Sequence, residues 1–142
     1  MLNDVNAMPV FNKVILDSGY RSLEYQQQVF DYYVDRYGLD EAKKRVALVG
    51  TSEHHTGLAI DFALNVNGEY LDELSGNEQE LIWLADNAYK YGFILRYPKG
   101  KESITGYNYE PWHFRYVGSK EIALDLKNRN LTLEEYLDGN LN

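Results

Sequence analysis

Short stretches of alternating or uninterrupted apolar residues along the chain predict strands. A strand points successive side chains to opposite faces, so a period of two, or a compact apolar run that ends in turn residues, is its usual signature. In residues 58–64 the large apolar side chains would face the core, whereas Asp61 shares the opposite face with Ala59 and Ala63. That face of small residues would leave space for a ligand beside Asp61. The predicted strands are 13–17, 58–64, 93–97 and 112–117.

Apolar residues at intervals of three and four predict a long helix near the beginning of the chain. It would run from Ser22 to about Tyr37, and Gly38 would end it. The residues at helical spacing are Tyr25, Val29, Tyr32 and Tyr33. Arg21 would then lie between the end of a strand and the start of this helix.

Three further helices are predicted from caps and spacing. A short helix over residues 40–47 would have Asp40 as its cap, and a longer one over 77–91 would begin at Asn77. The last helix would start near Thr132, because the sequence Thr132-Leu133-Glu134-Glu135 has the spacing of a capping box.

Helices and strands mix along the chain without a regular βαβ alternation. Asn67-Gly68, between two apolar stretches, predicts a hairpin turn. This mixture favours an α+β fold with a small central antiparallel sheet flanked by helices. At 142 residues, without an evident linker or internal repeat, the chain is expected to form a single catalytic domain over residues 1–142.

Charge and composition exclude several classes of protein. The net charge of -8 and the pI of about 4.8 disfavour binding to phosphate backbones, so no nucleic-acid partner is expected. No stretch approaches the roughly 20 apolar residues that cross a bilayer, so no transmembrane segment is predicted. Cysteine is absent, which leaves His, Asp and Glu as the ligands for any metal ion.

All three histidines lie in two short segments that also contain carboxylates. The first segment is Ser52-Glu53-His54-His55-Thr56-Gly57-Leu58-Ala59-Ile60-Asp61, and the second, 49 positions after Asp61, is Glu110-Pro111-Trp112-His113. Two imidazoles and one carboxylate can hold a divalent metal whose fourth position stays open for water. We therefore expect His54, Asp61 and His113 to bind a metal ion, whereas His55 would support the site or lie on the surface.

Glu110 is the candidate general base. Pro111 disfavours a helix at Glu110, so a helical zincin arrangement is improbable and a strand start at His113 fits better. The bend at the proline would let Glu110 reach the cavity that His113 faces. A carboxylate next to a water molecule whose pKa zinc has lowered to about 7 can accept its proton.

Arg21 is the candidate for binding charge on the substrate. It follows Ser18-Gly19-Tyr20 in a turn at a strand end, which often presents functional side chains. Its guanidinium offers a fixed fork for a carboxylate or for a developing oxyanion. The alternative is an ordinary surface arginine at a helix start.

Three motifs together resemble the VanY-type D-alanyl-D-alanine carboxypeptidases, a zinc metallopeptidase family that includes VanX dipeptidases, VanXY enzymes and LdcB-type L,D-carboxypeptidases. The motifs are Ser18-Gly19-Tyr20-Arg21-Ser22, Ser52-x-His54-x-x-Gly57-x-Ala59-x-Asp61 and Glu110-Pro111-Trp112-His113. They occur in the order of the family, and the similarity spans roughly residues 13–118. The resemblance implies the Hedgehog/DD-peptidase fold and one catalytic zinc ion.

The resemblance also implies roles for individual residues. His54, Asp61 and His113 would be the zinc ligands and Glu110 the base. Arg21 would stabilise the scissile carbonyl oxygen. Ser52 and Gln26 would help to hold the substrate. The expected reaction removes the terminal D-Ala from peptidoglycan stem peptides.

Alternatives remain open at the level of specificity and location. An LdcB-like L,D-carboxypeptidase would use the same machinery on tetrapeptide stems, and a VanX-like dipeptidase matches the motifs less closely. A third alternative is a zinc-bearing wall-binding module without catalysis. Loss of catalysis usually shows as an altered ligand, base or arginine, and all are intact here. Residues 1–10 have neither a basic start nor a long apolar run, so no export segment is expected in this stretch. We expect a monomer that works outside the membrane, at the cell surface or wall, and a cytoplasmic location is the alternative.

Overall fold

The computed structural model describes residues 1–140 and divides into two compact units. The first unit contains Met1–Asp17 together with the chain from Ile60 onward, and the second contains Ser18–Ala59. That residues 1–142 form a single catalytic domain remains a prediction from the sequence. Helices and a small antiparallel sheet occur together, so the predicted α+β class is confirmed.

The first unit is organised by a five-stranded sheet in the order β1-β2-β5-β4, with β3 paired to β2. In the β2–β3 hairpin Val66 pairs with Glu69, and Asn67 and Gly68 both have positive φ, of 55° and 95°. These are the angles of a type I′ turn, so the predicted hairpin is confirmed. The strands are β1 Lys13–Ser18, β2 Ala59–Val66, β3 Glu69–Leu71, β4 Phe93–Leu95 and β5 His113–Tyr116.

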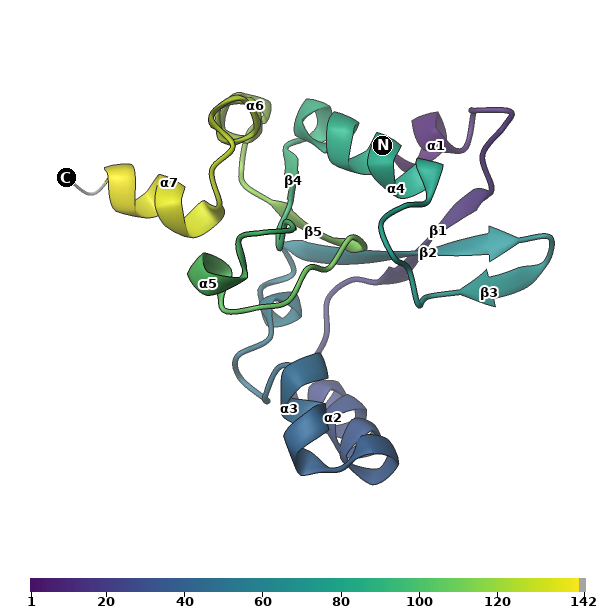
Figure 1. Ribbon diagram of the computed structural model, residues 1–142, viewed down its shortest axis with the longest axis vertical. Coiled ribbons are helices and arrows are strands. Elements are labelled where there is room, and N and C mark those ends of the chain that lie inside the picture. Colours follow the sequence, from purple (N-terminus) through teal and green to yellow (C-terminus); the bar gives the residue numbers. More distant parts are fainter. Residues whose placement is uncertain (141–142) are drawn as a thin grey trace. The chain divides into compact units, whose positions relative to one another are not determined.

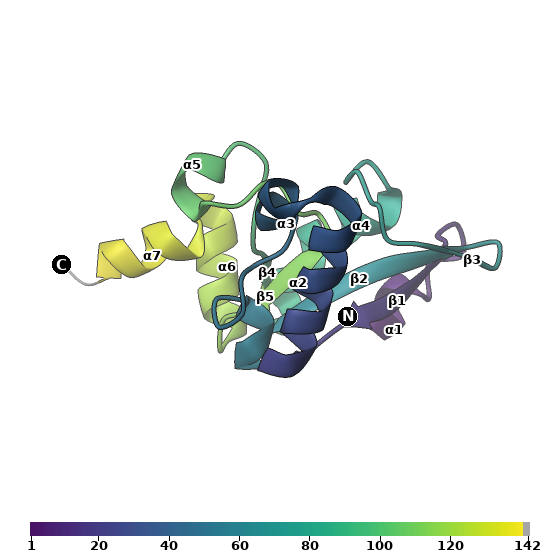
Figure 2. The ribbon, with the colours of Figure 1, turned by 90° about the horizontal axis from the view of Figure 1, so that it is seen from below.

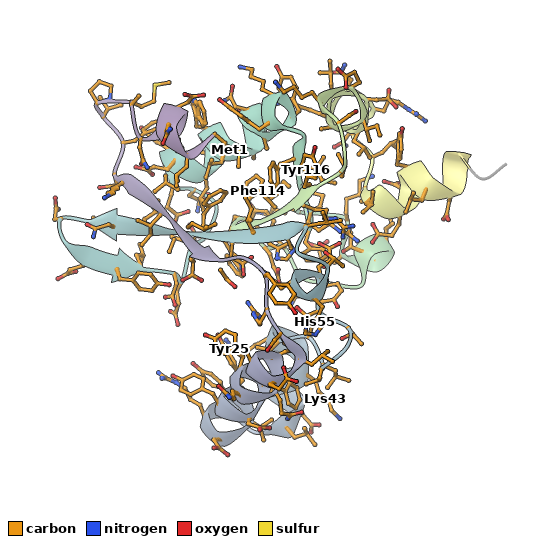
Figure 3. The ribbon with its side chains drawn as sticks, turned by 180° about the vertical axis from the view of Figure 1, so that it is seen from behind. Met1, Tyr25, Lys43, His55, Phe114 and Tyr116 are labelled. Carbon is orange, nitrogen blue, oxygen red and sulfur yellow. The ribbon has the colours of Figure 1, made fainter. Side chains whose placement is uncertain are left out.

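The main core lies between the sheet and helix α4 (Gln79–Asn87), which Figure 1 shows on one side of the strands. The rings of Phe62 and Phe114 meet edge to face, with centroids 5.6 Å apart. Phe114 lies among the side chains of the sheet in Figure 3. The large side chains of the strand predicted at residues 58–64 therefore face the core. Leu58 is the exception, because it is exposed and precedes β2. The buried members of this core are Val5, Val14, Phe62, Leu64, Leu74, Leu81, Leu84, Ala88 and Phe114.

Helix α4 differs from its prediction at both ends. Glu78, not Asn77, precedes it, and the Glu78 carboxylate accepts hydrogen bonds from the backbone N–H groups of Ser75 and Gly76. These bonds order the loop before the helix. The 3₁₀ helix η2 (Ala88–Tyr91) follows α4, and Gly92 ends it in the left-handed conformation, as expected.

Three helices of the first unit were not predicted. They are α1 Leu2–Val5, α5 Glu102–Thr105 and α6 Lys120–Arg129. Helix α6 forms a second small core, in which Ala123 and Leu126 pack against Ile94 of β4. The predicted capping box is confirmed at the start of α7 (Leu133–Asn140). The end of the predicted last helix, at 141–142, lies outside the described residues.

The second unit contains α2 (Leu23–Tyr37), α3 (Leu39–Arg45) and the one-turn 3₁₀ helix η1 (Glu53–Thr56). Ser22 caps α2, and Gly38 follows its end, as predicted. The buried residues of α2 are Gln26 and Phe30, whereas Tyr25 and Tyr32 are each 55% exposed, so the apolar spacing did not identify its buried face. Figure 3 shows Tyr25 on this helix.

Helix α3 begins one residue before its predicted cap. Gly38 takes the cap position, and Asp40 lies in the first turn. A carboxylate there still interacts favourably with the positive end of the helix dipole. The prediction of Asp40 as the cap was therefore wrong, although the helix itself exists.

Candidate functional site

Two of the three predicted metal ligands meet on adjacent strands of the first unit. Asp61 lies within β2 and His113 begins β5, and the backbone N–H of Phe62 donates to Trp112 O at 3.1 Å. This register places His113 Nδ1 2.9 Å from Asp61 Oδ1. Both residues are buried, at 4% and 9% exposure. Strand pairing thus brings together two residues that are far apart in the sequence.

The distance between Asp61 and His113 suits two ligands of one metal ion. Zinc bonds to nitrogen and oxygen of about 2.0–2.2 Å, at tetrahedral angles, put neighbouring ligand atoms roughly 3.3 Å apart. The observed 2.9 Å needs only a small adjustment to reach that value. An imidazole nitrogen and a carboxylate oxygen are also donor types that zinc prefers. The first unit therefore supplies a fitting half of a zinc site.

Glu110 lies beside this pair, as the sequence predicts. Its Oε2 is 3.8 Å from His113 Nδ1, and its side chain is 21% exposed. Residues 110–112 are not helical, and the N–H of His113 donates to Glu110 O at 3.2 Å. The bend at Pro111 thus turns the Glu110 side chain toward His113. A carboxylate that lies next to a predicted metal ligand and is still reached by water is placed for proton transfer.

Tyr97 is a neighbour of the site that sequence reasoning did not identify. Its ring centroid is 5.0 Å from that of His113 and 4.5 Å from that of Tyr107. Tyr97 O also accepts the N–H of Glu110 at 3.1 Å. The sequence placed Tyr97 at the end of a predicted strand, but the partner of a strand-end side chain cannot be read from a local pattern.

The second unit holds His54 in a fixed orientation. His54 Nδ1 is 2.7 Å from Gly19 O, and a carbonyl can only accept, so Nδ1 carries a proton; in a neutral imidazole this leaves the lone pair on Nε2. The side chain is buried at 4% exposure. Ser52 caps η1, and Gly57 ends it in the left-handed conformation with φ 69°. A histidine that ligates a metal through one ring nitrogen usually donates a hydrogen bond of this kind from the other.

His55 supports the neighbouring loop. Its Nε2 accepts the N–H of Gly50 at 3.2 Å, so its Nδ1 is protonated and donates to Arg21 O at 2.7 Å. Both ring nitrogens are therefore engaged with backbone groups of the second unit. This arrangement fits the expectation that His55 supports the site rather than ligates a metal. Figure 3 labels its position.

Arg21 is held by several groups of the second unit besides His55. Its two terminal nitrogens donate to Gln26 Oε1 at 2.9 Å and to Ser18 Oγ at 3.0 Å, and its backbone N–H donates to His54 O at 3.2 Å. Gln26 is fully buried, and its Nε2 donates to Ala47 O at 2.7 Å. The oxygen and the nitrogen of the Gln26 amide thus both bind protein groups, and the oxygen helps to orient the Arg21 guanidinium.

Ser52 has a structural contact of its own. Its hydroxyl accepts the N–H of His54 at 3.4 Å, and its carbonyl accepts the N–H of His55 at 3.1 Å. Ser52 is only 7% exposed. It therefore orients the histidine turn, whatever further contact it makes with a substrate.

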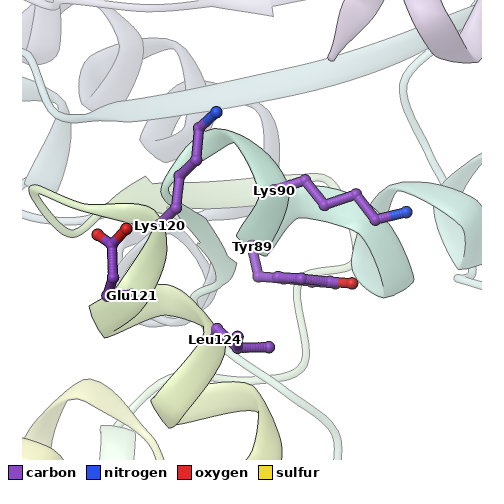
Figure 4. A pocket seen from close by; sticks show the side chains of 5 residues that line it. All are labelled: Tyr89, Lys90, Lys120, Glu121 and Leu124. Atoms are coloured by element: carbon purple, nitrogen blue, oxygen red, sulfur yellow. The ribbon is translucent and has the colours of Figure 1, made fainter.

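A separate groove lies between η2 and α6 in the first unit. It encloses about 260 Å³ and is lined by Tyr89, Lys90, Lys120, Glu121 and Leu124. Figure 4 shows Tyr89 and Leu124 near each other, with the side chains of Lys90 and Lys120 extending away from them. None of these residues belongs to the predicted site.

Among the described helices, none combines the length and the apolar character that a membrane span requires.

Comparisons with known proteins agree with the residue pattern. The family model of VanY, D-alanyl-D-alanine carboxypeptidase, matches residues 1–119. The chain is 53% identical to YodJ of Bacillus subtilis (strain 168) over 121 residues, which cover 85% of this chain and 44% of YodJ. The chain spans less than half the length of YodJ and of the D-alanyl-D-alanine carboxypeptidases of Enterococcus faecalis and Enterococcus faecium that it also matches.

Solved structures give the same result for the fold. The LdcB LD-carboxypeptidase superposes with a TM-score of 0.80 at 46% identity, over 97% of this chain and 63% of that chain. A mutant of the D,D-pentapeptidase VanY in complex with Zn(II) superposes with a TM-score of 0.80 at 38% identity, over 96% of this chain and 76% of that chain. Fold, motifs and family model agree, and the chain belongs to the VanY family of D-alanyl-D-alanine carboxypeptidases.

Proposed function

We propose that this protein is a zinc-dependent D-alanyl-D-alanine carboxypeptidase that removes the terminal D-Ala from peptidoglycan stem peptides. The buried pair of Asp61 and His113, with the Glu110 carboxylate beside it, is the observation that carries the proposal. A metal ligand pair next to a partly exposed carboxylate is the arrangement that metal-assisted hydrolysis requires. The family match and the zinc complex of VanY support the same reading.

Zinc would be held by Asp61, His113 and His54. The first two already lie at a distance that suits ligands of one ion. His54 is the proposed third ligand because its Nδ1 proton is donated to Gly19 O, which directs the lone pair to Nε2. Only seven positions separate it from Asp61 in the sequence. Bound zinc would polarise the peptide carbonyl and lower the pKa of a coordinated water molecule to about 7.

Glu110 would move the protons of the reaction. Its carboxylate would accept a proton from the attacking water and return it to the amine of the departing D-Ala. General acid–base catalysis of this kind contributes roughly 10²–10⁴-fold to a rate. The side chain is 21% exposed, so the substrate and water can reach it.

Arg21 would stabilise the oxygen of the scissile carbonyl. A guanidinium has five N–H donors in a fixed plane, and the bonds to Gln26 and Ser18 set the orientation of that plane. Donors that are oriented before the reaction stabilise a developing oxyanion without a cost of reorganisation. Ser52 and Gln26 would shape the substrate site, and Gln26 would do so by holding Arg21 in place.

The stem peptides of peptidoglycan lie outside the membrane, so we place the protein at the cell surface or wall, where it would act as a monomer. A second candidate is L,D-carboxypeptidase activity on tetrapeptide stems. The 46% identity to LdcB supports it. Both reactions use the same proton transfers, and they differ in the residue that precedes the terminal D-Ala.

Defined stem peptides test both candidates. The zinc-loaded protein is incubated with a pentapeptide ending in D-Ala-D-Ala and with the matching tetrapeptide, and the products are identified by mass spectrometry. Loss of one alanine from the pentapeptide, prevented by a chelator and restored by zinc, supports the proposal. Loss of alanine from the tetrapeptide alone favours the L,D-carboxypeptidase. Absence of hydrolysis from both peptides in zinc-replete protein would rule out both.

A further inference from the structure

Arg96 and Tyr97, which follow β4 directly, run alongside the proposed ligand and base. The backbone N–H of Arg96 donates to His113 O at 3.1 Å. One residue later, Tyr97 O accepts the N–H of Glu110 at 3.1 Å. The two hydrogen bonds extend the pairing of β4 and β5 beyond Leu95. This short segment therefore contacts the backbone on both sides of Pro111.

The side chain of Tyr97 contacts the imidazole of His113. The two ring centroids are 5.0 Å apart, with 32° between the ring planes. On the tyrosine side, Tyr107 stacks on Tyr97 with centroids 4.5 Å apart and planes 23° apart. Tyr97 is only 5% exposed, so its ring has little room to move. A ring packed against the imidazole restricts rotation of the imidazole about its side-chain torsion.

Arg96 connects Tyr97 to helix α7. Its guanidinium carbon lies 4.9 Å from the centroid of the Tyr97 ring. Its two terminal nitrogens donate to the two carboxylate oxygens of Glu134 at 2.6 and 3.0 Å. Arg96 is 8% exposed, and a charge so buried needs such a two-bond partner. Burial pushes the pKa of Glu134 upward, but the hydrogen bond and charge of Arg96, together with hydrogen bonds from the Glu134 backbone and from Thr132, outweigh burial and lower that pKa.

Helix α7 is itself firmly placed. Its capping box is complete, because Thr132 N–H donates to Glu135 Oε2 at 2.8 Å and Glu135 N–H donates to Thr132 Oγ1 at 3.2 Å. Glu135 also accepts two hydrogen bonds from Lys101, at 3.0 and 3.1 Å. Figure 2 shows α7 beside α5, the helix that Lys101 precedes. Glu134 thus projects from a helix start that is held at two points.

We infer that Arg96 and Tyr97 are positioning residues for His113 and Glu110, and that α7 holds them in place through Glu134. The inference rests on the proposed function, because it takes His113 as a zinc ligand and Glu110 as the base. Helix α7 lies beyond residues 1–119, which the family model matches. A helix outside the matched segment would therefore be part of what makes the zinc site work.

Replacement of the Tyr97 ring tests the contact with His113. Tyr97→Leu removes the aromatic face, whereas Tyr97→Phe keeps it. Loss of a group that orients a metal ligand typically weakens metal affinity or activity by about 10- to 100-fold. We expect Tyr97→Leu to weaken zinc affinity within this range, measured by competition with a coloured chelator on the full chain. Tyr97→Phe is expected to keep the affinity within about threefold of the original.

Replacement of Glu134 tests the contribution of α7. Glu134→Gln should weaken zinc affinity and lower kcat by about 10-fold, with little change in KM, because the substrate contacts stay in place. Lys101→Gln is the matched control. It removes a second charged contact of α7, the one to Glu135, but leaves the Arg96–Glu134 pair, so its zinc affinity should equal that of the original chain. Circular dichroism and the melting temperature identify any variant that fails to fold.

The outcomes separate this inference from the proposed function. If the original chain binds zinc and hydrolyses stem peptide, but folded Tyr97→Leu and Glu134→Gln keep its zinc affinity and kcat, the inference is wrong and the proposed function stands. If Lys101→Gln weakens zinc binding as much as Glu134→Gln, α7 acts only through general stability and the inference fails. If the original chain binds no zinc, both fail. Selective loss in Tyr97→Leu and Glu134→Gln supports the inference.

Discussion

The two units orient their proposed functional side chains by different physical means. In the first unit Asp61 and His113 are aimed by paired strands, and Phe62 and Phe114 beside them are packed in the core. In the second unit Arg21 and His54 lie in turns and a 3₁₀ helix, where hydrogen bonds to backbone carbonyls and buried amides hold them.

This difference determines how each half should respond to mutation. A strand position keeps its direction through the sheet register, so replacement of one side chain there removes chemistry and little else. A turn position depends on a few specific hydrogen bonds, so a replacement at one residue displaces its neighbours as well. Variants in the second unit should therefore show wider effects than their distance from the reaction suggests.

The largest expected effect comes from loss of a proposed zinc ligand in either unit. His54→Ala should bind no zinc at micromolar concentration and lose all turnover, and so should His113→Ala, because two protein ligands hold zinc poorly. His55→Ala is the matched control for the second unit and should retain one zinc ion per chain. Zinc content after dialysis, measured by atomic absorption, checks this. Full zinc loading of the His54→Ala protein would show that His54 is not a zinc ligand.

Removal of the proposed base should separate catalysis from metal binding. Glu110→Gln keeps the size of the side chain but cannot accept a proton at neutral pH, so kcat should fall by about 10²–10⁴-fold. Zinc content should stay at one ion per chain, since Glu110 is not a proposed ligand. Steady-state kinetics with the pentapeptide and a metal assay give the two values. Turnover near that of the original chain would exclude Glu110 as the base.

Variants of Arg21 and Gln26 sharpen the contrast between strands and turns. Arg21→Lys keeps a positive charge but loses the planar fork, so kcat should fall by about 10²-fold or more, as for a lost oxyanion donor. Gln26→Leu keeps the volume but removes the acceptor for Arg21, and about a 10-fold loss of kcat is expected. Zinc affinity should not change in Arg21→Lys. Full activity in Gln26→Leu would show that Arg21 does not need the hydrogen bond to Gln26 for its role.

The smallest expected effect is on the pH dependence of stability in the first unit. The pKa of Glu134 is lowered in the folded state, so its contribution is present above the usual glutamate pKa of about 4.3 and is lost as pH falls through the lowered value. Glu134→Gln should therefore melt about 2 °C below the original chain at pH 6, with a smaller difference at pH 3. Differential scanning calorimetry at both pH values measures this difference. An equal difference at both values would contradict the assignment.

Local patterns in the sequence were sufficient for much of the fold. The type I′ turn at Asn67-Gly68, the stop at Gly38 and the capping box at Thr132 were all predicted, because each depends on residues that are close along the chain. Helix α6 was missed, although Ser119 caps it. Its few apolar residues lie among charged ones, and its stability comes from packing against β4. The buried face of α2 was missed because Gln26 is polar yet buried, with hydrogen bonds that satisfy its amide, whereas the apolar ring of Tyr25 is exposed.

The sequence by itself determined which residue types are present for the chemistry, namely the histidines, the carboxylates and the arginine of the three motifs. It also indicated that Asp61 lies on the opposite face of its strand from the large core residues. Only the tertiary structure decided that Asp61 meets His113, that Tyr97 packs on His113, and that Arg96 binds Glu134. These contacts join residues from separate elements, and strand pairing and helix docking depend on the energy of the whole core rather than on local patterns.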